Sequence, residues 1–286
     1  MMDKLHAANW THAGDIRPEP GRLASPLPIR ERIEACARAG FAGMGFIFED
    51  VSAALRMYSG SDIRSMLSAN GIDQVELEAL TDWFSEGAPM GEEALRLAEA
   101  IGATQIKAIG AFEGDVLPEE MVSGFARTCD RFGELGAKVV IELMKASNLN
   151  TLEKGLAVVV GAGRSNGGIL VDSMHVVRCG MSLNAVAAMP PGTLLAVELD
   201  GVPEGPPDPD FWADMVDHRL QPDEGQFDNA LLVNAAKSAG FDGPWGVEIV
   251  AKAHRALELD EAVSRSASAM RAVLARASDI SAPGVD

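Results

Sequence analysis

The feature that most constrains this chain is a repeated unit in which a helical pattern ends at a glycine and a short apolar segment follows. The glycines lie at intervals of 31, 31 and 34 residues: Gly40, Gly71, Gly102 and Gly136. Glycine just past a helix adopts the left-handed conformation that ends it, which other residues adopt only at a cost. The apolar segments that follow, 41–48, 74–80, 104–109 and 138–143, have the length and composition of buried strands.

The second half of the chain continues this alternation, with apolar segments at 168–171, 194–199 and 245–250. Together with 5–10 they make eight candidate strands. Short strands that alternate with helices require a parallel sheet covered on both faces. Eight such units in 286 residues are typical of a (β/α)8 barrel. The main alternative, a doubly wound open sheet, is disfavoured because the chain lacks a glycine-rich dinucleotide fingerprint.

We therefore predict a single (β/α)8 TIM barrel over residues 1–277 with its active site at the C-terminal face, followed by a flexible tail over 278–286. Long connections after three of the strands, at 11–27, 81–90 and 201–225, would lie at that face.

Composition narrows the class of partner. The chain has 24 Lys and Arg against 42 Asp and Glu, a formal charge of −18. This charge argues against binding to nucleic acid or to anionic membranes, which needs basic patches. Three widely spaced cysteines suit a reducing cytosol, and neither a signal peptide nor a membrane-spanning apolar run is apparent. We expect a cytoplasmic protein with a small-molecule substrate, and a homo-oligomer is possible.

Acidic residues interrupt four strands that should be continuously apolar. The segments 139–141, 169–171, 195–197 and 245–247 run into Glu142, Asp172, Glu198 and Glu248. These are the predicted strands five to eight, so the carboxylates should converge at one side of the barrel mouth. Two like charges 4 Å apart repel by roughly 4 kcal/mol at an effective dielectric constant near 20.

A divalent cation is the natural partner of such a cluster, and oxygen ligands favour Mg²⁺ or Mn²⁺. The alternative is that the acids cap helices separately or pair with nearby Lys145, Arg178 or Lys252. Asp200 could replace Glu198 as a ligand if the strand register differs.

These motifs resemble the xylose isomerase-like TIM-barrel family, usually called sugar phosphate isomerases/epimerases. The family pattern is a Glu that ends strand five, Asp-x-x-His after strand six, a metal ligand on strand seven and a Glu on strand eight. Here it reads Val140-Ile141-Glu142, Asp172-Ser173-Met174-His175, Val197-Glu198-Leu199-Asp200 and Gly246-Val247-Glu248. Residues 218–228 resemble the family's Arg-…-Pro-Gly-Glu-Gly loop, with Asp223 in place of the first glycine. The similarity covers nearly the whole chain.

The resemblance implies a metal held by Glu142, Asp172, Glu198 and Glu248. Glu142 and Glu248 would double as the acid/base pair. His175 would contact a substrate oxygen, and Arg219 would bind a substrate hydroxyl or carboxylate. This chain departs from the family pattern on strand seven. Ketose 3-epimerases typically place a histidine there and 3-dehydroshikimate dehydratases a glutamine, whereas this chain has Glu198. The endonuclease IV branch, with its histidine-rich zinc cluster, is excluded by five histidines and the acidic charge.

For several other side chains we consider two alternative roles. His175 is either a substrate contact or a histidine satisfied by the backbone. His6 begins the first strand and either contacts substrate or faces the barrel interior without a role. Trp83 either walls the pocket or anchors its long loop by packing. For Lys107 we favour neutralisation of Glu142 over substrate binding.

A cation at the barrel mouth would polarise a substrate carbonyl and stabilise an enediolate. Two glutamates could then move a proton, which gives epimerisation or aldose–ketose isomerisation. We predict a Mn²⁺- or Mg²⁺-dependent isomerase or epimerase acting on a sugar, ketose or cyclic polyol. One alternative is a dehydratase or lyase acting on a keto-cyclitol, keto-sugar or 3-dehydroshikimate-like compound, which would use the same residues. Another is a non-catalytic binding protein. No phosphate cradle is apparent in the sequence.

Overall fold

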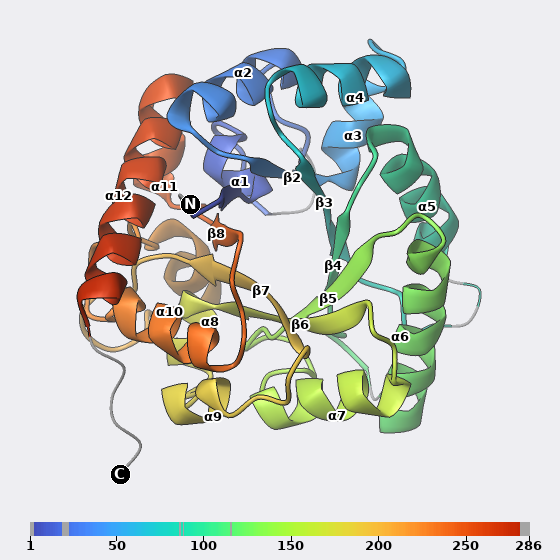
Figure 1. Cartoon of the computed structure of the whole chain (residues 1–286), viewed down its shortest axis with the longest axis vertical. Coiled ribbons are helices and arrows are strands. Elements are labelled where there is room, and N and C mark those ends of the chain that lie inside the picture. The colour runs from blue at the N-terminus through green and yellow to red at the C-terminus, as the bar shows by residue number, and fades with distance from the viewer. Residues whose placement is uncertain (1–2, 19–22, 86, 88, 115, 281–286) are drawn as a thin grey trace.

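Eight parallel strands pair in chain order, and β8 pairs with β1, so that the sheet closes into a barrel with the helices outside it (Figure 1). The computed structural model describes residues 3–18, 23–85, 87, 89–114 and 116–280. The strands are β1 Leu5–Ala7, β2 Gly43–Ile47, β3 Gln74–Leu80, β4 Gln105–Ile109, β5 Lys138–Glu142, β6 Gly167–Asp172, β7 Leu194–Leu199 and β8 Trp245–Val247. The predicted (β/α)8 barrel is confirmed.

The strands are followed by helices, and the longer helices cover the outside of the barrel (Figure 1). The helices are α1 Asn9–His12, α2 Ile29–Ala39, α3 Phe48–Ala54, α4 Gly60–Ala69, α5 Pro89–Ile101, α6 Pro118–Gly133, α7 Leu152–Ala162, α8 Ser173–Arg178, α9 Leu183–Ala187, the π-helix η1 Ala213–Asp217, α10 Asn229–Ser238, α11 Lys252–Arg255 and α12 Leu259–Asp279. α12 runs two residues past the predicted end of the barrel at 277. Residues 281–286 of the expected tail lie outside the described residues.

The four glycines of the repeated unit have positive φ, as their place after helices predicts. Gly40 is the clearest case: with φ at 89° it ends α2, and its N–H donates to the Ala37 carbonyl at 3.0 Å. Each glycine turns the chain from a helix back towards the next strand.

The space between the sheet and the helices is apolar, whereas much of the barrel interior is polar. On β3, Val75 and Leu77 belong to the main hydrophobic core, and Glu76 and Glu78 alternate with them on the inner face. The buried polar side chains inside the first four strands are His6, Glu76, Glu78, Gln105 and Lys107. On the opposite side of the interior, Val140, Leu170 and Ala196 form a small apolar cluster.

Two glycines of β2 make room for these polar side chains. A Cβ at Gly43 would lie 2.5 Å from His6 Nδ1, and a Cβ at Gly45 would overlap the Glu78 carboxylate. Their lack of a side chain leaves the interior hollow enough to hold an imidazole ring and a carboxylate.

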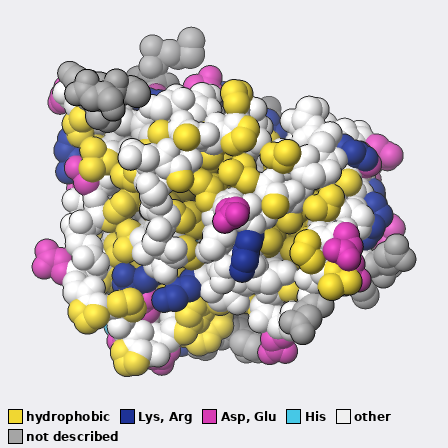
Figure 2. Space-filling view, turned by 90° about the horizontal axis from the view of Figure 1, so that it is seen from below, with side chains coloured by type: hydrophobic (Ala, Val, Ile, Leu, Met, Phe, Trp, Pro, Cys, Tyr) yellow, Lys and Arg dark blue, Asp and Glu magenta, His cyan; other side chains and the backbone are white. Residues whose placement is uncertain are grey.

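The surface shows mixed charge on the face seen in Figure 2. Its Lys and Arg side chains lie among acidic and apolar groups and do not merge into one basic surface. Among the described residues, no helix is long and apolar enough to cross a membrane.

Candidate active site

Three of the four predicted carboxylates converge inside the barrel. Glu142 ends β5, Glu198 lies on β7, and Glu248 directly follows β8. Each offers an oxygen within 4.8 Å of those of the other two, and all three residues are buried. The convergence follows from parallel pairing, because neighbouring strands bring their C-terminal ends to the same rim.

Asp172, the fourth predicted ligand, lies beside this cluster and has partners on both oxygens. It ends β6 and caps α8: its Oδ1 accepts from the His175 N–H at 2.9 Å. Its Oδ2 lies 3.2 Å from Nη1 of Arg219. Capping by a carboxylate stabilises the start of a helix, so Asp172 also has a structural role.

Lys107 is a buried cation that contacts two of the three converging carboxylates. Its Nζ lies 2.8 and 2.9 Å from the two oxygens of Glu198 and 3.1 Å from Oε1 of Glu248. It also lies 3.4 Å from Glu78 and 3.8 Å from Glu76.

The expectation that Lys107 neutralises Glu142 is therefore wrong in its choice of partner. Lys107 pairs in register with Val140, whereas Glu142 pairs with Ile109, two residues further along β4. Lys107 thus lies one pleat deeper in the barrel than Glu142, where the carboxylates of other strands are nearer.

Arg219 is the second buried cation. Its Nη1 lies 2.7 Å from Oδ2 of Asp200, 2.7 Å from Oε2 of Glu248 and 3.2 Å from Asp172. Its Nε donates to the Met215 carbonyl at 2.8 Å, which fixes the side chain in place. Asp200, the alternative ligand on strand seven, is therefore a partner of Arg219.

The repulsion among the acids is relieved partly by these two side chains, so the divalent ion expected from the sequence would not be the sole source of positive charge at the site. Of the nearby bases weighed from the sequence, Arg178 pairs instead with Asp214 at 2.6 Å. The two cations buried at this site, Lys107 and Arg219, contact six carboxylates: Glu76, Glu78, Asp172, Glu198, Asp200 and Glu248.

Burial and neighbouring carboxylates disfavour the ionised form of two of the acids, against the attraction of Lys107 and Arg219. Burial raises the pKa of Glu198 and of Asp200 well above their ordinary values. Glu248 differs: burial opposes its ionisation, but Lys107 and Arg219 outweigh it and lower its pKa to about 2. Glu248 is therefore a carboxylate at neutral pH. The converging oxygens of Glu142, Glu198 and Glu248 are suitable ligands for a divalent cation.

Glu142 and His175 face each other at this site. The Nε2 of His175 lies 3.3 Å from Oε1 of Glu142, and both residues are buried. Within the described part of the chain, neither ring nitrogen of His175 has a hydrogen-bond partner. A buried imidazole whose ring nitrogens make no hydrogen bond is available to contact a substrate oxygen.

His6 lies deeper in the barrel than Glu248, at the level of Glu198. It pairs in register with Gly246, two residues before Glu248. Burial, with a smaller effect from Lys107, lowers its pKa to about 3, so the ring is neutral. Its Nε2 lies 3.8 Å from Glu76, and His6, Glu76 and Glu78 form a second group of converging ligand atoms. For His6 to contact substrate, as predicted, the substrate would have to reach deeper into the barrel than Glu248.

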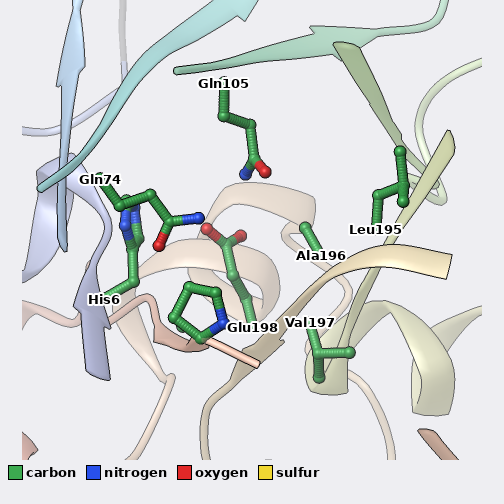
Figure 3. A pocket seen from close by; sticks show the side chains of 9 residues that line it. His6, Gln74, Gln105, Leu195, Ala196, Val197 and Glu198 are labelled. Carbon is green, nitrogen blue, oxygen red and sulfur yellow. The ribbon is translucent and has the colours of Figure 1, made fainter. Parts of the chain in front are cut away.

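A small hollow adjoins His6 at the end of the barrel where the strands begin. Figure 3 shows Gln74, Gln105 and Glu198 pointing towards one another across it.

Trp83 has the contacts of a packing anchor. It is buried, its indole N–H donates to the Ile109 carbonyl at 2.8 Å, and its ring meets Phe125 edge-on at 5.7 Å. These contacts favour the hypothesis that Trp83 anchors its long loop by packing over the hypothesis that it forms a wall of the pocket.

Sequence reasoning missed Glu76, Glu78 and Gln105 as part of the interior. A signal was present in the segments 74–78 and 105–107, where polar residues alternate with apolar ones. In a strand covered by helices on its outer face, this alternation indicates polar side chains inside the barrel.

Comparison with known proteins gives concordant matches. The model of the family described as "Xylose isomerase-like TIM barrel" matches residues 33–273. A 3-dehydroshikimate dehydratase from Pseudomonas aeruginosa is 23% identical over 246 residues, which cover 82% of this chain but only 38% of that enzyme. An inosose isomerase from Bacillus velezensis is 19% identical over 264 residues, which cover 87% of this chain and 92% of that enzyme.

The fold is also shared with a crystal structure of the IOLI protein that contains a zinc atom. The two superpose with a TM-score of 0.80 at 18% identity, over 96% of this chain and 98% of the other. The curated relatives named above are both enzymes.

Proposed function

Because this chain belongs to the xylose isomerase-like TIM barrel family, we propose that it is a divalent-metal-dependent isomerase or epimerase acting on a sugar, a ketose or a cyclic polyol. The observation that carries the proposal is the convergence of Glu142, Glu198 and Glu248 within 4.8 Å, with His175 facing Glu142. The inosose isomerase relative supports a cyclic polyol or its keto form as substrate.

In this proposal Glu142, Asp172, Glu198 and Glu248 hold the ion, with Mn²⁺ or Mg²⁺ as the expected metal. When bound, the ion supplies Lewis-acid polarisation of a substrate carbonyl. The side chains do the rest. Glu142 and Glu248 remove and return the proton on the carbon next to that carbonyl, through an enediolate. Positioned acid/base groups contribute roughly 10²- to 10⁴-fold each.

His175 and Arg219 orient the substrate in this scheme. His175 contacts a substrate oxygen from the side of Glu142. Arg219 binds a hydroxyl or carboxylate while its ion pairs with Asp172, Asp200 and Glu248 keep the guanidinium in place. The partner is a small molecule, and we propose neither a nucleic acid nor a membrane.

The second candidate is a dehydratase or lyase acting on a keto-cyclitol, keto-sugar or 3-dehydroshikimate-like compound. The dehydratase relative favours it. The chemistry differs in one step: an acid protonates a β-hydroxyl, which leaves as water, instead of returning a proton to carbon. A non-catalytic role is disfavoured because the curated relatives are enzymes.

Incubation in D₂O with Mn²⁺ separates the two reactions. A keto-inositol and 3-dehydroshikimate serve as probes, followed by proton NMR. We expect deuterium to enter at the carbon next to the carbonyl of the keto-inositol, without loss of water. Loss of water from either probe would replace the first candidate with the second. Absence of both exchange and dehydration, across ketoses as well, would contradict the proposal.

A further inference from the structure

Lys107 contacts both carboxylate oxygens of Glu198 inside the barrel. Both oxygens of Glu198 lie within 2.9 Å of the Lys107 Nζ, and both side chains are buried. Figure 3 shows the Glu198 side chain directed between Gln74 and Gln105, towards the barrel interior. Glu198 is thus held by a cation that the chain itself supplies.

Glu248 is held in a similar way, by a different cation on each oxygen. Its Oε1 accepts from Lys107 at 3.1 Å and its Oε2 from Arg219 at 2.7 Å. Two of the three converging carboxylates therefore have both oxygens engaged by cationic side chains, whereas Glu142 faces an imidazole.

A divalent ion placed among these oxygens must share them with the Lys107 ammonium. Two positive charges a few ångströms apart repel strongly in a buried site. Each lone pair of Glu198 that is given to the ammonium is also less available to a metal. The presence of Lys107 therefore weakens the site for any divalent cation.

We propose that Lys107 sets the divalent-cation affinity of this site, because it competes with the ion for Glu198 and Glu248. Glu198 then acts mainly as the partner of Lys107, and Glu142, Asp172 and Glu248 carry most of the metal binding. This inference rests on the metal-dependent function proposed above and concerns the same site.

Binding of Mn²⁺ to the purified protein, followed by electron paramagnetic resonance and calorimetry, tests the inference without a substrate. Lys107→Met removes the charge and keeps the length of the side chain, so we expect Mn²⁺ to bind roughly 10- to 100-fold more tightly. Lys107→Arg keeps the charge and should bind no more tightly than the unmodified protein. Lys154→Met, at an exposed position on α7, is the matched control.

A second variant keeps the test decisive if Lys107→Met does not fold. The double substitution Lys107→Met with Glu198→Gln removes one positive and one negative charge, so the buried charge balance is preserved. We expect it also to bind Mn²⁺ more tightly than the unmodified protein. Binding that is equal or weaker would show that Glu198 is an essential ligand and would overturn the inference.

The outcomes separate this inference from the proposed function. If the unmodified protein binds Mn²⁺, Glu142→Gln abolishes that binding and Lys107→Met leaves it unchanged, then the metal site stands and the role of Lys107 falls. If neither the unmodified protein nor any Lys107 variant binds Mn²⁺, the metal-dependent function itself is contradicted, and the inference with it.

Discussion

Glu248 illustrates how single residues acquire their chemistry in this barrel. Its carboxylate is buried, which by itself would favour the protonated form. Lys107 and Arg219 reverse that preference and hold the pKa at about 2. The residue is thus an anion fixed in position, suited to hold a cation and to shape the approach of a substrate.

Glu248→Gln is therefore expected to abolish turnover while the protein stays folded. The amide has nearly the same shape but lacks the charge that Lys107 and Arg219 face, and both cations keep other acidic partners. We expect at least a ~10²-fold loss of deuterium exchange into the responsive substrate, with an unchanged circular dichroism spectrum. Glu93→Gln, in an exposed pair with Arg96, is the control. Undiminished exchange would remove Glu248 from the mechanism.

For single residues, the sequence predicts the positions of the acidic side chains better than it predicts which cations pair with them. Glu142, Glu198 and Glu248 are conspicuous because each interrupts an apolar strand, and the structure brings them together. The role of Lys107 depends on its depth, and depth depends on the register between β4 and β5. Register is fixed by the packing of the whole barrel, so inspection of a single strand does not reveal it.

Among the elements, the connection from β7 to α10 matters most for the site because it carries Arg219. It is folded tightly on itself: Gly201 and Leu220 exchange two backbone hydrogen bonds at 2.8 and 2.9 Å. Gly225 has φ at 87°, and a Cβ there would overlap the backbone of Val202. The position of Arg219 thus depends on close backbone contacts at both ends of the connection.

Gly225→Ala should displace this connection. Positive φ costs an alanine about 1–2 kcal/mol, and the clash with Val202 backbone adds to it. Gly240→Ala is a matched control, because Gly240 has φ at 88° but nothing within 4 Å of its added Cβ. Urea unfolding should show a larger loss of stability for Gly225→Ala, together with a raised KM for the responsive substrate. Equal losses in the two variants would mean that the contact with Val202 does not matter.

The order of strands and helices could be predicted from glycine and apolar periodicity, because both signals are local in the chain. The strands observed over 74–80 and 194–199 match the predicted ranges. The short α8 and the π-helix η1 could not be predicted in this way. Both lie in connections whose conformation depends on tertiary ion pairs, such as Arg178 with Asp214.

For the whole molecule, the buried acids make stability depend on pH. Burial raises the pKa of Glu78 to about 8, against the opposing effect of Lys107, from an ordinary value of 4.5. Between these values the unfolded chain ionises Glu78 while the folded protein keeps its proton. Unfolding then releases a proton, so the contribution of Glu78 to stability falls as pH rises from about 4.5 to 8.

Glu78→Gln should remove that contribution. Measured with chelator present, the melting temperature of the unmodified protein relative to the variant is expected to decrease steadily over this pH range. The raised pKa of Glu78 makes its contribution to the free energy of unfolding change across this pH range. We expect a change of several degrees in the Tm difference, because about 1 kcal/mol shifts the Tm of a domain of 150–250 residues by roughly 2–4 °C. Glu93→Gln should show no such trend. A difference that is flat with pH would mean that Glu78 is ionised in the folded protein.

The glycines of β2 have a broader consequence for how this barrel could be altered. Side chains that fill the lumen of a barrel normally supply dispersion and hydrophobic free energy, and here Gly43 and Gly45 supply neither. The packing free energy that stabilises this barrel must then come mostly from the apolar interface between the sheet and the helices. Aliphatic residues placed in the lumen would add packing free energy, but they would displace the polar side chains, such as His6 and Glu78, that the two glycines accommodate.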